Sequence, residues 1–315
     1  MSQAAPPPTP EVPSVLYIAG EPVRVLEELG SAKANKFRHF ALDLPLLPWK
    51  TRRVARMPRA ASPGINMLRL AIEERTLRQF AHPNLPHVFD EVDDEQTLRG
   101  FVTEELIFPG RGFWQYLYPN GGLTLDAFLV HAEELCDGLH ALHMRGCTHG
   151  DPALRNIAFR PGIAVDDWTA VWADLEWSGE LGKPSRGSEP NQFVFTPAYA
   201  SSEQVRGGPI TASAECASLA ICLLSVLTGI AGYESKTAVE TVRAVCEPAL
   251  PDEMARRLAD LPVPTALKDL LVAMRHPVPA HRPVKSADGF MRRLERIRAL
   301  STIGELAFVI PPPPV

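Results

Sequence analysis

Cysteine is scarce in this chain of 315 residues, and its pattern does not suggest disulfides. The cysteines are odd in number, widely spaced and mostly within apolar stretches: Cys136, Cys147, Cys216, Cys222 and Cys246. Small secreted domains that depend on disulfides carry cysteine at much higher density. We therefore expect a fold built on a hydrophobic core, in a reducing, cytoplasmic compartment.

A basic surface and a long hydrophobic run are also missing. The 32 Lys and Arg residues are outnumbered by 37 Asp and Glu, giving a formal net charge of -5, which argues against a dedicated nucleic-acid binder. The longest uncharged run, residues 216–233, has only 18 residues and contains several Ser and Thr, near the lower limit for spanning a bilayer. We interpret it as a buried helix and expect neither nucleic-acid nor membrane partners.

Proline, in contrast, is abundant, with 31 residues in the chain, about twice the average usage. Proline runs lie near both ends, in APPPTP near the start and in PPPP at residues 311–314. We predict a disordered Pro-rich tail at residues 1–14 and a second Pro-rich tail at residues 303–315. Such runs favour polyproline II, so the tails are either ligands for a proline-recognition domain or plain solvated spacers.

The hydrophobic pattern changes once along the chain. Between residues 15 and 103, short strand-like runs are interrupted by one helical stretch at residues 65–80. After Glu105, apolar residues recur at helical spacing, first behind the expected helix cap Thr124. The pattern predicts an α+β fold with a sheet-rich lobe at residues 15–103, a helical lobe at residues 104–302 and a cleft between them.

Three polar residues in the second part form a pattern with chemical meaning. Asp151 is followed five positions later by Asn156 in a polar loop, and Asp174 stands at the end of a short apolar run 18 residues further on. Phosphoryl transfer from a nucleotide requires one group to accept the proton of the attacking hydroxyl and two oxygen donors for magnesium. Asp151, Asn156 and Asp174 are therefore the candidate catalytic residues.

These segments resemble the protein kinase superfamily. The catalytic loop of that family reads His-Arg-Asp followed by four residues and Asn, and its metal-binding motif reads Asp-Phe-Gly. Here the segments read His149-Gly150-Asp151 with Asn156, and Asp174-Leu175-Glu176. The resemblance implies a bilobal kinase-like fold, ATP and Mg2+ as cofactors, and Asn156 and Asp174 as metal ligands.

Two later blocks extend the resemblance. FTPAYASSEQ is similar to the end of a kinase activation segment, with Glu203 at the Glu of the family's Ala-Pro-Glu, and ECASLAICLLSVLTG resembles the family's buried helix, with Glu215 in place of Asp. Arg282 falls where the family keeps an Arg that pairs with that Glu, here Glu203. The resemblance spans residues 15–300, nearly the whole folded part.

The resemblance also implies nucleotide-binding residues in the first part. FVTEEL is similar to the family's hinge, with Thr103 guarding the back pocket and the backbone of Glu104 to Leu106 facing adenine. In the family, a helix glutamate pairs with a lysine on a neighbouring strand, and Glu73 stands at that helix position. The segment RRVARM resembles the strand that carries the lysine, Val-Ala-x-Lys. This resemblance implies that Ala55 lies in the nucleotide site.

The sequence departs from the family at the phosphate-binding positions. Of the three glycines in the family's phosphate loop only Gly30 is present, and Met57 stands where the lysine is expected. Arg56 is adjacent, but strand side chains alternate faces, so it should point away from the nucleotide if Met57 points toward it. Lys33 or Lys36 from the loop is the expected substitute, as in the with-no-lysine kinases.

Three hypotheses remain open. The first is a protein kinase-like phosphotransferase that moves the γ-phosphate of ATP to a hydroxyl of a protein substrate, Ser or Thr rather than Tyr. The second is a pseudokinase that binds a nucleotide or a protein partner without catalysis, which Met57 and Glu176 favour. The third is a small-molecule phosphotransferase, suggested by the His-Gly-Asp sequence and disfavoured by the segment that contains Glu203.

Overall fold

The computed structural model describes residues 12–29, 37–48, 50–59, 63–109, 118, 122–162, 167–184, 195–233 and 237–312. These residues form two compact units. One contains the chain up to Ala71 together with Val88–Glu105, and the other contains Ile72–His87 together with the chain from Leu106 onward. The first is rich in sheet and the second is mostly helical, which fits a kinase-like fold.

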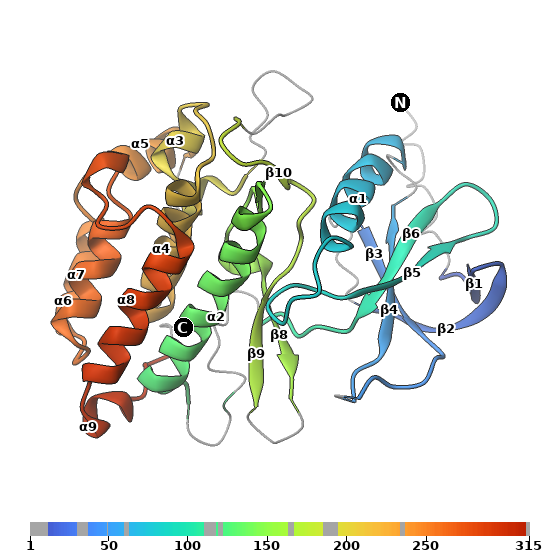
Figure 1. Cartoon of the computed structure of the whole chain (residues 1–315), viewed down its shortest axis with the longest axis horizontal. Helices are drawn as coiled ribbons and strands as arrows, with labels where there is room; N and C mark the ends of the chain where they lie inside the picture. Colours follow the sequence, from blue (N-terminus) through green and yellow to red (C-terminus); the bar gives the residue numbers. More distant parts are fainter. Residues whose placement is uncertain are drawn as a thin grey trace, which may run out of the picture. The chain divides into compact units, whose positions relative to one another are not determined.

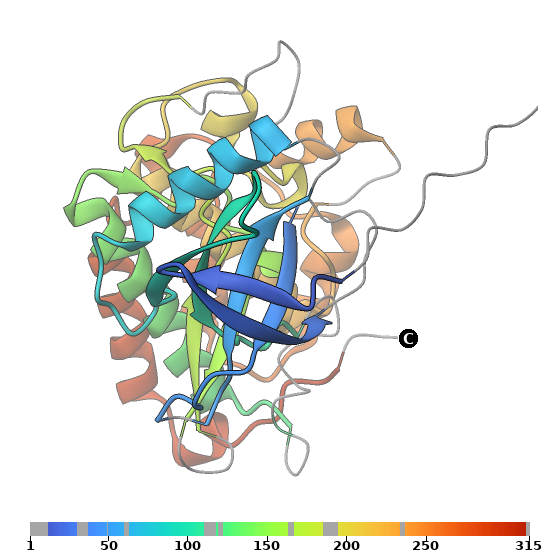
Figure 2. The same cartoon turned by 90° about the vertical axis from the view of Figure 1, so that its right-hand side faces the viewer.

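The first unit is an antiparallel sheet closed into a barrel in the order β1-β2-β3-β4-β6-β5. Its strands are β1 (Val15–Ile18), β2 (Glu21–Leu29), β3 (Phe37–Leu42), β4 (Arg53–Pro58), β5 (Val88–Asp93) and β6 (Arg99–Glu104). The closing contact pairs Tyr17 of β1 with Asp93 of β5. Figure 2 shows the two strands of the β1–β2 hairpin crossing in front of the rest of the sheet.

The inside of this barrel is a continuous apolar core. The side chains that fill it are almost fully buried: Leu16, Val25, Phe40, Leu42, Ala55, Met57, Val92 and Val102. Met57 retains only 2% of its surface exposed. Because side chains on a strand alternate between faces, the placement of Ala55 and Met57 inside directs Val54 and Arg56 to the other face of β4.

Helix α1 (Pro63–Leu77) follows β4. The expected helix at residues 65–80 is confirmed, although it ends earlier, and residues 78–80 continue as a turn. The segment after it belongs to the second unit because it is bonded to β9 (Trp168–Trp172). The side chain of Asn84 donates to the carbonyl of Ala170 at 2.9 Å, and the Asn84 carbonyl accepts the N–H of Trp172 at 3.0 Å.

The second unit is mostly helical. Its other elements are α2 (Leu125–Met144), β7 (Cys147–Thr148), β8 (Ile157–Pro161), β10 (Gly179–Glu180), α3 (Ser202–Val205), α4 (Ala212–Thr228), α5 (Ala238–Cys246), α6 (Asp252–Asp260), α7 (Thr265–Met274), α8 (Ala287–Leu300) and α9 (Ile303–Leu306). Figure 1 shows α8 lying beside α2, and β8 and β9 forming a hairpin. As expected, Thr124 caps α2, accepting the N–H of Ala127.

Helix α4 confirms the interpretation of the long uncharged run. Every residue from Ser213 to Thr228 is buried, Thr211 caps the first turn, and Gly229 ends the helix in the left-handed conformation with φ 71°. A helix buried on all sides needs an apolar sequence all round, which explains the absence of charge after Glu215. No helix in the described part of the chain combines the length and apolar character needed to cross a bilayer.

The chain continues to fold past the predicted boundary at residue 302. After α9, the Phe308 carbonyl accepts the N–H of Leu125 at 2.8 Å, and the N–H of Ile310 donates to the Leu123 carbonyl at 2.9 Å. Ile310 is fully buried, so this segment is bonded to the start of α2. Residues 1–11 of the first predicted Pro-rich tail and residues 313–315 of the second lie outside the described residues.

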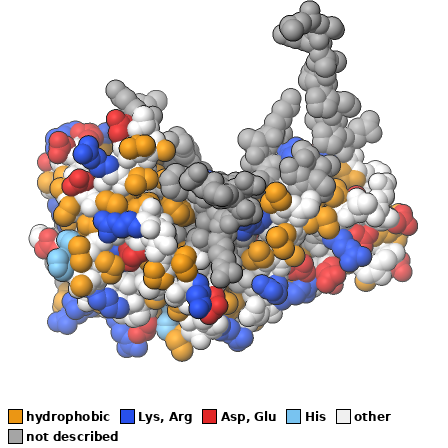
Figure 3. Space-filling model, turned by 90° about the horizontal axis from the view of Figure 1, so that it is seen from above, with side chains coloured by type: hydrophobic (Ala, Val, Ile, Leu, Met, Phe, Trp, Pro, Cys, Tyr) orange, Lys and Arg blue, Asp and Glu red, His pale blue; other side chains and the backbone are white. Residues whose placement is uncertain are grey.

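Surface charges of both signs are interspersed. On the face seen in Figure 3, Lys and Arg side chains lie among Asp, Glu and hydrophobic side chains. Such a mixture agrees with the small net charge of -5. The expectation that nucleic acid is not a partner stays a prediction.

The close approach of β4 and β6 generates the first testable prediction. A Cβ on Gly100 would lie 2.0 Å from the Arg56 carbonyl oxygen and 2.8 Å from the Met57 sulfur. Gly100→Ala should therefore lower the free energy of unfolding by about 1–3 kcal/mol, measured by urea denaturation. Gly64→Ala in α1 is the control, because a Cβ there meets nothing within 4 Å, and it should be neutral or stabilising. Equal effects of the two substitutions would contradict the packing described.

Candidate functional site

Asp151 lies in a loop between β7 and β8, and only 2% of the residue is exposed. The carboxylate accepts two hydrogen bonds from Thr196, from the backbone N–H to Oδ1 at 2.6 Å and from the hydroxyl to Oδ2 at 2.8 Å. Arg155 donates to Oδ2 at 2.8 Å. Donors on both oxygens fix the direction of the carboxylate and offset the cost of burying its charge.

Asn156 is held against the same carboxylate. It closes a short 3-10 turn that begins at Leu154. Its Nδ2 donates to the Asp151 carbonyl at 2.8 Å and to the Asp151 Oδ2 at 3.2 Å. With the amide nitrogen used as a donor to Asp151, the amide oxygen is the group that Asn156 can offer to a cation.

Asp174 follows the end of β9 and has a left-handed backbone, with φ 64°. This conformation costs a residue other than glycine roughly 1–2 kcal/mol, and Asp tolerates it better than most. Unusual backbone of this kind concentrates at functional sites. The next residue, Leu175, donates its N–H to Oε1 of the buried Glu73 at 3.3 Å, so a second predicted site residue lies beside Asp174.

Glu215 anchors the loop that carries Asp151. This fully buried carboxylate accepts the backbone N–H of His149 at 3.1 Å and of Gly150 at 2.7 Å, and it pairs with the Nε2 of His143 at 2.8 Å. Burial raises the pKa of the Glu215 carboxyl, but the His143 and backbone contacts outweigh it, and the pKa lies below its usual 4.5. The residue is therefore a buried anion held by three donors.

His149 has a structural role. Its Nε2–H donates to the Ala173 carbonyl at 3.1 Å, its Nδ1 accepts the N–H of Asp151 at 3.3 Å, and its ring packs edge-on against Trp172. Burial lowers the pKa of His149. The neutral ring thereby connects the Asp151 loop to the residue that precedes Asp174.

Gly150 replaces the arginine of the family motif for a steric reason. Its φ is 89°, and a Cβ at this position would lie 2.1 Å from the carbonyl oxygen of Trp177. Both the left-handed backbone and the close approach require glycine here. The departure from His-Arg-Asp therefore follows from the packing of the loop against residues just after Asp174.

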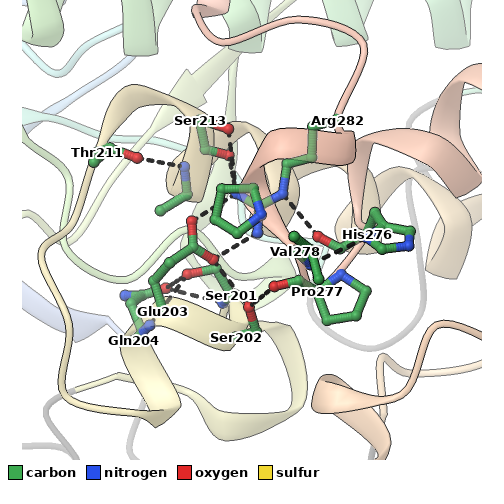
Figure 4. A network of polar contacts seen from close by, with 12 residues as sticks. Ser201, Ser202, Glu203, Gln204, Thr211, Ser213, His276, Pro277, Val278 and Arg282 are labelled. Carbon is green, nitrogen blue, oxygen red and sulfur yellow. Dashed lines mark hydrogen bonds and ion pairs between the residues drawn. The ribbon is translucent and has the colours of Figure 1, made fainter.

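The predicted pairing of Glu203 with Arg282 is confirmed. Arg282 donates to both carboxylate oxygens of Glu203, at 2.7 and 2.5 Å, and its side chain is fully buried. The same guanidinium donates to the Ser213 carbonyl at 3.0 Å and the His276 carbonyl at 2.9 Å. Figure 4 shows the fork of Arg282 facing Glu203. These hydrogen bonds hold the segment after Thr196 against the start of α4 and against the chain that precedes α8.

Sequence reasoning missed two residues of this network. Thr196 contacts the Asp151 carboxylate directly, and the motif gave no sign of it. Gln204 closes a capping box with Ser201 at the start of α3, and its Nε2 donates to the Gly150 carbonyl at 3.0 Å. The spacing Ser-x-x-Gln is a signal of a helix start that could have located α3, though not its contact with Gly150.

The remaining predicted nucleotide contacts belong to the first unit, except Leu106, which belongs to the second. Thr103 and Glu104 end β6, and Leu106 follows. The hydroxyl of Thr103 is buried and has no hydrogen-bond partner among the described residues. Ala55, in contrast, lies inside the barrel next to Met57. Gly30, Lys33 and Lys36 lie outside the described residues.

Comparison with known proteins agrees with these motifs. The chain is similar to bacterial serine/threonine protein kinases. It shares 26% identity over 182 residues with PkaA of Streptomyces coelicolor, covering 58% of the chain and 32% of the relative. It shares 26% identity over 243 residues with pkn3 of Myxococcus xanthus, covering 72% and 43%, and 22% over 214 residues with PknB of Lactococcus lactis, covering 65% and 32%.

The chain thus spans less than half the length of these curated relatives. No protein-family model matches it. The identities support a likeness to the protein kinase superfamily as a whole, and the roles of single residues depend on the geometry described above.

The buried ion pair generates a second prediction. Arg282→Met leaves the Glu203 carboxylate without its partner and should lower the free energy of unfolding by about 3 kcal/mol or more. The control is Arg256→Met, which breaks an exposed pair with Glu253 and should leave the stability nearly unchanged. Urea denaturation of both variants measures the difference, and similar losses would contradict the role assigned to Arg282.

Glu215 generates a third prediction, on pH dependence. Because its folded-state pKa is lowered, its ionisation contributes stability that is present above pH 4.5 and is lost as the pH falls through the folded-state pKa. Glu215→Gln should therefore cost about 2 kcal/mol or more at pH 7, and the gap to the wild type should narrow below pH 4.5. Denaturation at a series of pH values tests this, and a gap that widens in acid would contradict it.

Proposed function

We propose that this chain is a protein kinase-like phosphotransferase that moves the γ-phosphoryl group of ATP to a Ser or Thr hydroxyl of a protein substrate. The observation that carries the proposal is the buried Asp151 carboxylate. Its Oδ2 receives the hydroxyl of Thr196, while Oδ1 accepts a single hydrogen bond from the described residues. A carboxylate oxygen has capacity for a second donor, so Oδ1 can accept the hydroxyl of a substrate.

The chemistry that Asp151 would perform is limited and specific. The acceptor hydroxyl donates its proton to Asp151, and its oxygen forms a bond to the γ-phosphorus as the bond between that phosphorus and the β–γ bridging oxygen breaks. ADP leaves with the bridging oxygen, and the proton stays on the carboxylate. Arg155 and Thr196 keep Asp151 oriented, which is the main protein contribution in this class of reaction.

Asn156 and Asp174 have the oxygen donors that suit Mg2+. The ion typically takes one or two protein ligands and completes its shell with phosphates and water. The described residues contain no group of three or more His, Cys, Asp or Glu side chains placed to hold a metal. When bound, Mg2+ would neutralise charge on the phosphates.

The pseudokinase alternative rests on a specific observation. Glu176 is buried at the position where the family motif has glycine, and Thr196 donates one hydrogen bond to each oxygen of Asp151. A chain in this state could bind a nucleotide or a protein partner without transfer. The small-molecule alternative is weaker, because Arg282 holds the segment at Thr196–Gln204 in place, as expected of a segment that docks a protein substrate.

Two other expectations stay predictions. One is that the Pro-rich tails are ligands for a proline-recognition domain, and the other is a cytoplasmic location.

Nucleotide binding tests the proposal first. At about 100 times its dissociation constant, a ligand that binds only the folded state stabilises it by roughly 2.7 kcal/mol. We expect Mg-ATP to raise the melting temperature of the wild type, and Asp174→Asn to remove the magnesium dependence of that rise. Asp260→Asn, an exposed carboxylate at the end of α6, is the control and should behave as the wild type.

Phosphoryl transfer separates the three hypotheses. The assay offers labelled ATP with peptide libraries in which Ser/Thr or Tyr is the only hydroxyl acceptor. Transfer to the Ser/Thr library that Asp151→Asn abolishes, with nucleotide binding retained, supports the proposal. Binding without transfer to any acceptor would indicate the pseudokinase, and transfer to small hydroxyl metabolites alone would indicate the third hypothesis.

A further inference from the structure

Strand β4 presents two different faces, and the pairing register decides which residues share each of them. Val54 of β4 lies opposite Thr103 of β6, and Arg56 lies opposite Phe101. Directly paired residues of antiparallel strands project to the same side. Arg56 therefore shares a face with Thr103, the residue expected to border the nucleotide, and Met57 does not.

The opposite face of β4 has no room for a ligand. Ala55 and Met57 project into the barrel, where they pack against Phe40, Val92 and Val102. The barrel is closed by the pairing of β1 with β5. A nucleotide bound against β4 would therefore contact the face that carries Arg56 rather than the barrel interior.

The surroundings of Arg56 suit a phosphate-binding cation. Its guanidinium carbon lies 4.6 Å from the centre of the Phe37 ring, and stacking of this kind orients the planar group. On the same face, the buried hydroxyl of Thr103 lacks a hydrogen-bond partner among the described residues. A buried polar group without a partner is costly, and a ligand that hydrogen-bonds to this hydroxyl would remove that cost.

We propose that Arg56 is the residue of β4 that binds the nucleotide phosphates, in place of the lysine that the sequence comparison locates at Met57. The proposal rests on the proposed function, because it assumes that the chain binds ATP. A guanidinium donates two parallel hydrogen bonds to phosphate oxygens and stays charged when buried. The alignment of Met57 with the family lysine is then wrong by one residue, and neither Lys33 nor Lys36 is needed as a substitute.

Substitutions on the two faces of β4 test this inference. Arg56→Met should weaken binding of Mg-ATP by about 10- to 100-fold, measured by isothermal titration, and Arg56→Lys should weaken it less because the charge remains. The control Arg53→Met removes a charge from the other face of the same strand, where Arg53 lies near Phe89, and it should bind as the wild type does. Circular dichroism checks that each variant is folded.

Met57 supplies the opposite test. Met57→Leu keeps an apolar side chain in the barrel and should bind Mg-ATP like the wild type. Met57→Lys buries an ammonium in an apolar core and should destabilise the first unit. A folded Met57→Lys variant that binds more tightly than the wild type would overturn the inference.

The outcomes for Arg56 and for the proposed function are distinguishable. If the wild type binds Mg-ATP and Arg56→Met binds it equally well, while Lys33→Met or Lys36→Met does not, Arg56 is excluded and a loop lysine takes its role. If the wild type binds no Mg-ATP at millimolar concentration, the proposed function fails and this inference fails with it.

Discussion

The organisation of the candidate site depends on one buried carboxylate, that of Glu215. It lies at the start of the most buried helix in the described chain and receives backbone donors from His149 and Gly150. An anion in this position is stable only with several donors around it, and the donors that the fold provides are the loop itself and His143 of α2. The position of Asp151, one residue further on, follows from this contact.

The rest of the site is connected to the same anchor by short polar links. His149 bonds to the residue before Asp174, Gln204 bonds to Gly150, and Thr196 bonds to Asp151. The Asp151 loop is thus bonded to the segments that contain Asp174 and Thr196. Arg282 then holds the outer end of the last segment through Glu203. A phosphoryl-transfer site needs this kind of fixed geometry, because its catalysis is mostly positioning and electrostatics.

Features that depend on local sequence or on the family motifs were predictable, and other long-range contacts were not. The apolar run that forms α4 and the cap Thr124 follow from periodicity and capping chemistry, and the Glu203–Arg282 pair follows from the family motifs. The contact of Thr196 with Asp151 joins residues 45 positions apart and has no local signature. The faces of β4 could not be predicted, because a shift of one residue exchanges the two sides of a strand. The buried core shows that Met57 points into the barrel, and the pairing with β6 shows that Arg56 shares a face with Thr103.

The most direct measurement is a crystal structure of the chain with Mg2+ and a non-hydrolysable ATP analogue. The account predicts oxygen atoms of Asn156 and Asp174 at about 2.0–2.1 Å from the metal, the guanidinium of Arg56 against phosphate oxygens, and Met57 still inside the barrel. A nucleotide that leaves Asn156 and Asp174 without metal, or whose phosphates are held by Lys33 or Lys36 with Arg56 turned away, would contradict it.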